Sequence, residues 1–335
     1  MPGYVLDGAG RVDLPRQPLA VTVTALDVPV VLRVLTADGA DFVSALYPKP
    51  GFAVLPKIDA EIVVVATPGT VTGFPQGTVL QTTIAVDSDQ TLDPDRAELT
   101  PLDVSGLHHV ELATVTPYGD HLTVAARKTA VDVPLNDLGA RARSAARGVL
   151  GVDRLPESRQ VRVEVDIDTT MSMAPLIDDG SVREIVDLLT GVAAVIGRRE
   201  ELHVNLIGHT VAPVRVSELR SAADEVQSAL DSAGLGIGFR STAVDRSGWS
   251  ETTLVYTVTD GIPADEGDGS SADVRRRPIV LSAQADTTPA AGTMPLVGDP
   301  LRRDSRLDDP AELFETVQSL VAGLASASDS EGLAS

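Results

Sequence analysis

The stretch VRVEVDIDTTMSMAPLI, residues 161–177, decides how the second half of this chain is interpreted. Its first eight residues place valine or isoleucine at every second position, a pattern typical of a β-strand. The predicted strand ends at Asp168, and the hydroxyl side chains of Thr170 and Ser172 follow. In open α/β sheets ligands bind at the carboxyl ends of the strands, so these three side chains stand where a ligand site is expected.

The sequence on either side of this stretch predicts alternating strands and helices. Apolar residues at helical spacing follow the first strand, and further apolar strands and helices come after them. Such alternation predicts a doubly wound parallel sheet, which we assign to residues 155–326, and the small polar residues 327–335 predict a disordered tail. The expected strands are 161–168, 203–208, 253–259 and 279–283, and the expected helices are 182–196, 217–230 and 313–324.

The first 130 residues predict only strands. Short segments rich in β-branched residues alternate with glycine- and proline-containing turns, which indicates an N-terminal β-sandwich-like domain. Residues 131–154 are expected to form a connector whose helix, 138–150, carries Arg141, Arg143 and Arg147. We expect these arginines on a solvated face or in ion pairs between domains.

The amino-acid composition restricts the kinds of partner and site that this chain can have. The 335 residues include 27 Lys and Arg against 48 Asp and Glu, a net charge of −21 that argues against binding to nucleic acids or anionic membranes. The absence of cysteine excludes disulfides and thiolate metal sites. No basic-then-apolar leader and no apolar run approaching the roughly 18 residues of a membrane span is visible, so we expect a cytoplasmic protein.

The motif DTTMS at 168–172 resembles the Asp-x-Ser-x-Ser motif of von Willebrand factor A domains, with threonine in the first hydroxyl place. The resemblance covers roughly half of the chain and implies a site for Mg²⁺ or Mn²⁺, cations that prefer hard oxygen ligands. It implies that Asp168, Thr170, Ser172, Thr242 and Asp260 hold the metal directly or through water. A carboxylate from a protein partner would complete the metal shell, and no catalysis is implied.

Two other interpretations stay open. Asp166 to Thr170 also satisfies the Asp-x-Asp-x-Thr motif and so resembles haloacid-dehalogenase-like phosphatases, which implies Asp166 as nucleophile and Asp168 as acid/base. The sequence lacks the phosphate-neutralising lysine, since no lysine follows Lys128. Alternatively, these residues only cap a helix, and the domain is a scaffold with a degenerate site. Charged residues at every second position of 161–168 indicate a partly exposed strand or such a degenerate site.

The segment DGADF at 38–42, followed by SAL at 44–46, resembles the calcium-binding segment of TerD-type tellurium-resistance stress proteins. This resemblance implies Ca²⁺ in the N-terminal domain and a role in bacterial stress. Our leading hypothesis is therefore a non-enzymatic, divalent-cation-dependent protein-binding module of an intracellular stress-response system.

Overall fold

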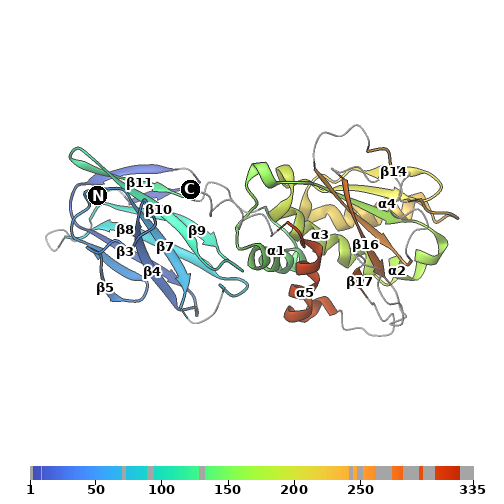
Figure 1. The fold of residues 1–335 in the computed structure, drawn as a ribbon, viewed down its shortest axis with the longest axis horizontal. Coiled ribbons are helices and arrows are strands. Elements are labelled where there is room, and N and C mark those ends of the chain that lie inside the picture. Colours follow the sequence, from blue (N-terminus) through green and yellow to red (C-terminus); the bar gives the residue numbers. More distant parts are fainter. Residues whose placement is uncertain are drawn as a thin grey trace, which may run out of the picture. The chain divides into compact units, whose positions relative to one another are not determined.

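The computed structural model describes most of the chain and divides it into two compact units, residues 1–132 and 133–335 (Figure 1). The described residues are 3–8, 10–69, 73–88, 94–127, 133–240, 244–246, 252–261, 274–281, 294–296 and 306–324. The mixed α/β architecture expected from the sequence is confirmed. Among the described residues, no helix is long and apolar enough to cross a membrane.

The first unit consists of two β-sheets. Their strand orders are β1-β9-β8-β3-β6-β5 and β2-β11-β10-β7-β4, and every pairing is antiparallel except that of β1 with β9. The buried side chains of both sheets form one hydrophobic cluster. The strands are β1 (Gly3–Leu6), β2 (Arg11–Pro15), β3 (Leu19–Ala25), β4 (Val30–Thr36), β5 (Leu46–Lys49), β6 (Phe52–Leu55), β7 (Ile62–Pro68), β8 (Val79–Val86), β9 (Arg96–Asp103), β10 (Val110–Tyr118) and β11 (His121–Ala126).

The alternation of buried and exposed side chains along the sequence explains these strands. In β4, Val30, Leu32 and Val34 are buried, while Val31 and Arg33 between them are exposed. Because successive side chains of a strand point to opposite faces, one face of β4 joins the hydrophobic cluster and the other meets solvent.

The second unit is built on one six-stranded sheet. Its strand order is β14-β13-β12-β15-β16-β17, and all neighbours are parallel except β14, which is antiparallel to β13. In chain order this is 3-2-1-4-5-6, so the chain direction across the sheet reverses between β12 and β15. The strands are β12 (Arg162–Asp168), β13 (His203–Ile207), β14 (Val211–Val214), β15 (Thr253–Thr259), β16 (Val274–Leu281) and β17 (Met294–Leu296), and the helices are α1 (Asp137–Leu150), α2 (Ala174–Asp178), α3 (Ser181–Ile196), α4 (Ala222–Ala233) and α5 (Pro310–Leu320).

The four long helices of this unit pack in one connected series, α5 on α1, α1 on α3 and α3 on α4. Their apolar side chains cluster with every second residue of the strands, including Val165 and Ile167 of β12 and Tyr256 of β15. The intervening residues of β12 and β15 therefore point to the other face of the sheet.

Helix α1 belongs to the second unit and does not behave as a solvated connector. A Cβ atom on Gly191 of α3 would lie 2.2 Å from the carbonyl oxygen of Gly139, so only glycine fits at this helix contact. Arg143 and Arg147, which we expected to be solvated or paired between domains, are buried. Arg147 pairs with Asp153 at 2.5 Å inside the same unit. The arginines of α1 thus stabilise this unit internally.

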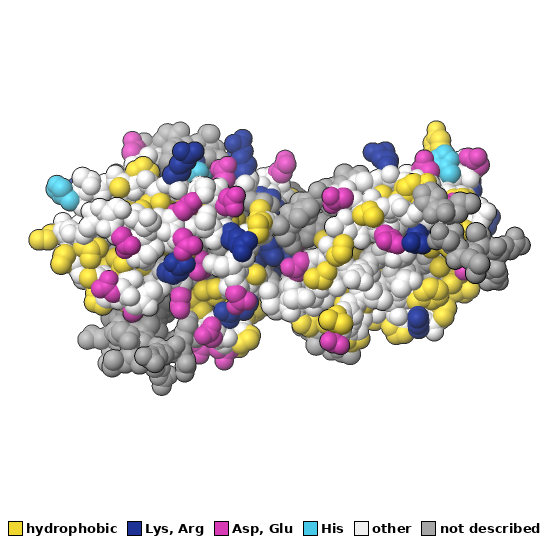
Figure 2. Space-filling model, turned by 180° about the vertical axis from the view of Figure 1, so that it is seen from behind, with side chains coloured by type: hydrophobic (Ala, Val, Ile, Leu, Met, Phe, Trp, Pro, Cys, Tyr) yellow, Lys and Arg dark blue, Asp and Glu magenta, His cyan; other side chains and the backbone are white. Residues whose placement is uncertain are grey.

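On the face shown in Figure 2, the acidic side chains of the described residues do not gather in one place. On the face shown in Figure 2, acidic side chains are spread among basic, polar and hydrophobic ones. The described residues thus form no single acidic patch on this face.

Candidate functional site

The carboxyl end of β12 carries a buried carboxylate. Asp168 is only 2% exposed. One of its oxygens, Oδ1, accepts a hydrogen bond from the backbone N–H of Thr170 at 2.8 Å. The other, Oδ2, accepts one from the hydroxyl of Thr259 at 2.8 Å. Both donors are neutral, and among the described residues no lysine, arginine or histidine forms an ion pair with Asp168.

Two hydroxyl groups lie on the loop that leaves Asp168. The Oγ atoms of Thr170 and Ser172 are 3.0 Å apart, and Ser172 is exposed. Thr170 has extended backbone angles, and the turn of 3₁₀-helix that follows it covers Met171–Met173. The structure therefore brings together three of the predicted metal ligands: Asp168, Thr170 and Ser172.

Asp260 and Thr242 complete the predicted set. Asp260 is half-buried and directly follows β15, the strand next to β12 in the sheet. Its neighbour Thr259, which sequence reasoning did not single out, links β15 to Asp168 through its hydroxyl. The only signal for Thr259 was its place at the end of an apolar strand before Asp-Gly. Thr242 lies outside the described residues.

Asp166, the nucleophile of the phosphatase interpretation, lies two residues earlier and has a cationic partner. Nη2 of Arg246 lies 2.8 Å from both of its carboxylate oxygens, and Nδ2 of Asn205 donates to Oδ1 at 3.0 Å. The same arginine donates through Nε to Glu164 at 2.8 Å. Arg162 donates to the other oxygen of Glu164 at 2.9 Å. Arg246 therefore bridges two carboxylates of β12.

This ion-pair network is buried. Glu164, Asp166 and Arg246 are each at most 5% exposed. Burial raises the pKa of Asp166 above its ordinary value, and the charge of Arg246 opposes that rise. The alternating charges of 161–168 suggested a partly exposed strand. In the structure they do not mark an exposed face. The strand is buried on both faces because Arg246 compensates its internal charges.

The segment that follows α4 is hydrogen-bonded to the loop that follows Asp168. The backbone N–H of Met171 donates to the carbonyl oxygen of Gly236 at 3.0 Å, and the N–H of Gly236 donates to that of Thr169 at 2.9 Å. These bonds form an isolated parallel bridge between Thr170 and Gly236. The segment after α4 thereby borders the site, although it is over 60 residues away in sequence.

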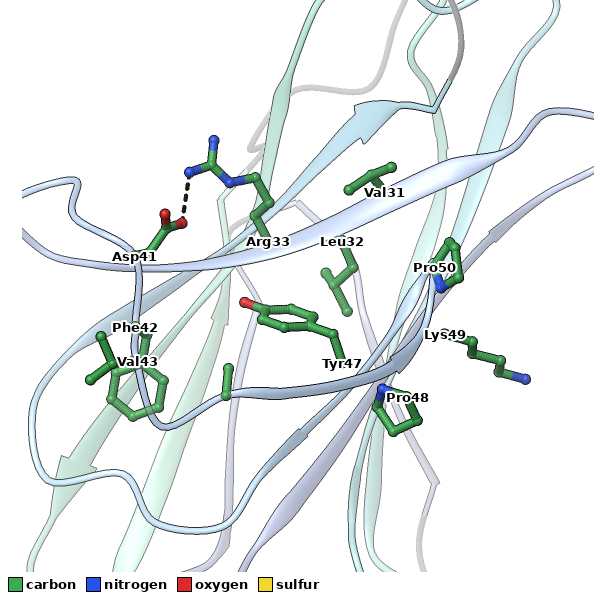
Figure 3. A pocket seen from close by; sticks show the side chains of 11 residues that line it. Val31, Leu32, Arg33, Asp41, Phe42, Val43, Tyr47, Pro48, Lys49 and Pro50 are labelled. Carbon is green, nitrogen blue, oxygen red and sulfur yellow. Dashed lines mark hydrogen bonds and ion pairs between the residues drawn. The ribbon is translucent and has the colours of Figure 1, made fainter.

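In the first unit, the segment that resembles TerD proteins borders a cavity of about 640 Å³ (Figure 3). Asp41 of this segment pairs with Arg33 at 2.6 Å, and Asp38 accepts a hydrogen bond from Thr36. The hydroxyl of Tyr47 accepts a hydrogen bond from the N–H of Val34 at 2.9 Å. The cavity is lined by Val31, Leu32, Arg33, Asp41, Phe42, Val43, Ala45, Tyr47, Pro48, Lys49 and Pro50.

Comparison with known proteins adds no relative. No protein-family model matches the chain, and no curated protein matches it.

Proposed function

We propose that the second unit is a protein-binding module of the von Willebrand factor A type that depends on Mg²⁺ or Mn²⁺. Asp168, Thr170 and Ser172 hold the cation directly or through water, together with Asp260 and Thr242. A carboxylate of a partner protein completes the coordination shell. The module catalyses no reaction.

The observation that carries this proposal is the environment of Asp168. A buried carboxylate is costly unless a cation compensates it, and buried charges in proteins are either paired or bound to metals. Asp168 is 2% exposed and accepts hydrogen bonds only from neutral donors among the described residues. A bound divalent cation would supply the missing positive charge.

The chemistry of the neighbouring groups fits Mg²⁺. This ion takes six oxygen ligands, retains several waters and binds few protein carboxylates. The hydroxyls of Thr170 and Ser172 are neutral oxygen ligands, and the exposure of Ser172 leaves the site accessible from solvent. A partner carboxylate could therefore replace a metal-bound water.

The strand order supports the same location. In open α/β sheets, ligands bind where the strand order reverses, outside the carboxyl ends of the strands. In this unit the reversal lies between β12 and β15, whose ends carry Asp168 and Thr259-Asp260.

The pairing of Asp166 favours a binding module over a phosphatase. A nucleophilic carboxylate needs a free oxygen that can reach the phosphorus atom. Arg246 contacts both oxygens of Asp166, and the side chain is fully buried. The phosphatase interpretation therefore lacks an accessible nucleophile in this conformation.

For the whole chain, we propose a role in a bacterial, intracellular stress-response system of the tellurium-resistance type. The support is the resemblance of residues 38–46 and the absence of cysteine. Two sheets around one hydrophobic cluster support a β-sandwich for the first unit. Calcium binding there remains part of the proposal, although Asp41 is paired with Arg33.

Calorimetric titration of the full chain with MgCl₂ tests the proposed function. We expect one Mg²⁺ site in the second unit, which Asp168→Ala abolishes and Asp178→Ala preserves. Asp178 is an exposed carboxylate on α2, close in sequence to the site, so it controls for a general loss of negative charge. Equal Mg²⁺ uptake by both variants would contradict the proposal, and so would Mg²⁺-dependent hydrolysis of p-nitrophenyl phosphate that requires Asp166.

A further inference from the structure

Exposed hydrophobic side chains gather at the edge of the candidate metal site. In the described part of the second unit, three large hydrophobic side chains are exposed: Met171 at 60%, Ile237 at 88% and Phe314 at 41%. Two of these three lie on the two loops that border the site. Exposed apolar side chains that cluster beside polar ligands often mark an interaction surface.

Backbone hydrogen bonds hold Met171 and Ile237 near each other. The N–H of Met171 bonds to the carbonyl of Gly236, and Ile237 is the next residue. Thr170 and Gly236 form a bridge, so both side chains leave from positions adjacent to a metal ligand. A Cβ atom on Gly236 would have no atom within 4 Å, so the space beside Thr170 is open.

The charge of the chain limits what this surface can accept. At a net charge of −21, a partner with several acidic residues would be repelled over a long range. A single carboxylate that reaches the metal, flanked by uncharged apolar residues, avoids that repulsion. Met171 suits such contacts because methionine is flexible and polarisable.

We infer that the partner of this module presents one carboxylate flanked by apolar side chains. The carboxylate binds the cation, and an apolar neighbour covers Met171 and Ile237. This inference rests on the proposed function, because it assigns the partner of the same site. Phe314 on α5 does not take part.

Three synthetic peptides, acetylated and amidated at their ends, test this inference. Their central residues are Val-Glu-Val, Ser-Glu-Ser and Val-Gln-Val, each flanked by glycine, and their affinities are measured by NMR titration with Mg²⁺ and with EDTA. With Mg²⁺ we expect the Val-Glu-Val peptide to bind about tenfold more tightly than the Ser-Glu-Ser peptide, the gain expected for burying about one valine side chain. We expect the Val-Gln-Val peptide not to bind.

Matched variants assign the effect to residues. Combining Met171→Ser with Ile237→Ser should remove the tenfold preference and leave the Mg²⁺ affinity unchanged, while Phe314→Ser should keep both. All three positions are exposed, so these changes leave the packed core intact.

The outcomes separate the inference from the proposed function. Equal binding of the two glutamate peptides overturns the inference and leaves metal-dependent carboxylate binding in place. Binding that is the same in EDTA, or no binding of any peptide, overturns both. If sedimentation shows a wild-type dimer that the double substitution dissociates, the occupant is a second copy of this chain and the inference is wrong.

Discussion

Asp166 and Asp168 lie two residues apart on one strand, yet their carboxylates have opposite surroundings. Both are buried, at 0% and 2% exposure. Asp166 receives both of its close cationic contacts from Arg246, whereas Asp168 accepts hydrogen bonds from the Thr170 N–H and the Thr259 hydroxyl. Arg246 compensates the first charge, whereas no described cationic side chain pairs with the second.

The difference follows from position along the strand. Asp166 lies inside the sheet, between β13 and β15, where water cannot solvate it. Asp168 lies at the end of the strand, where the following loop carries the hydroxyl groups of Thr170 and Ser172. The same degree of burial therefore accompanies an internal ion pair in the middle of the strand and a group of uncharged oxygens and N–H donors at its end.

The largest expected effect comes from removing Arg246, the cationic partner of Asp166 and Glu164. Arg246→Met leaves Glu164 and Asp166 buried without their shared arginine, and we expect the free energy of unfolding to fall by about 3–5 kcal/mol. Urea unfolding followed by the far-UV circular dichroism of the helices measures this loss, because all the described α-helices belong to the second unit.

Arg183→Met is the matched control, since Arg183 forms an exposed ion pair with Asp224 in the same unit. Exposed pairs contribute little, so we expect a loss below about 1 kcal/mol. Adding Glu164→Gln and Asp166→Asn to Arg246→Met should recover part of the lost stability by removing the uncompensated charges. Equal losses in Arg246→Met and Arg183→Met would show that the buried network does not compensate charge as described.

The next largest effect concerns Asp168, the carboxylate without a described cationic partner. The proposed Mg²⁺ site exists only in the folded second unit, so Mg²⁺ at about 100 times its Kd should raise the free energy of unfolding by about 2.7 kcal/mol. Asp168→Asn should abolish this gain while raising the stability of the metal-free protein, since it removes a buried charge that has no cationic partner among the described residues. Thermal unfolding with MgCl₂ and with EDTA measures both changes.

Asp166→Asn should have the opposite effect on the stability of the metal-free protein from Asp168→Asn. Although burial raises the pKa of Asp166, this substitution leaves the buried Arg246 with one carboxylate fewer, so we expect the metal-free protein to lose stability while the gain from Mg²⁺ persists. If the two substitutions changed stability in the same direction, the distinction between the two carboxylates would be lost.

The sequence predicted the local parts of this site and missed its long-range contacts. The strand, Asp168 and the hydroxyls of Thr170 and Ser172 are visible because they lie within a few residues of each other. Arg246 is 80 residues from Asp166, and nothing in its local sequence, VDRSG, indicates a buried ion pair. Without that arginine, the charges of β12 suggested an exposed or degenerate strand.

Helix α1 also depends on contacts between residues that are far apart in the sequence and so could not be predicted from it. Its basic residues and its position between the two units favoured a solvated connector. Its packing depends on the contact between Gly139 and Gly191, which joins two helices about 50 residues apart. Periodicity along one helix cannot show which other helix its small residues will meet.

The smallest predicted effect extends the comparison to a third carboxylate without a metal-binding loop. Asp187 on α3 is half-buried, and burial raises its pKa above the ordinary value of 3.8, although a hydrogen bond from Asn136 opposes the rise. A raised pKa means that the ionised group costs folding free energy at neutral pH and costs none once the pH falls below 3.8. Asp187→Asn should therefore raise the free energy of unfolding at pH 7.

The pH dependence separates this explanation from a simple change in packing. The gain from Asp187→Asn should shrink as the pH falls from 7 toward 4, whereas the exposed control Asp178→Asn should show no such trend. A gain that stays constant over this range would contradict a charge effect at Asp187. Because Asp187 is not one of the proposed metal ligands, Mg²⁺ should not change the Asp187→Asn result, which would confine the metal effect to Asp168.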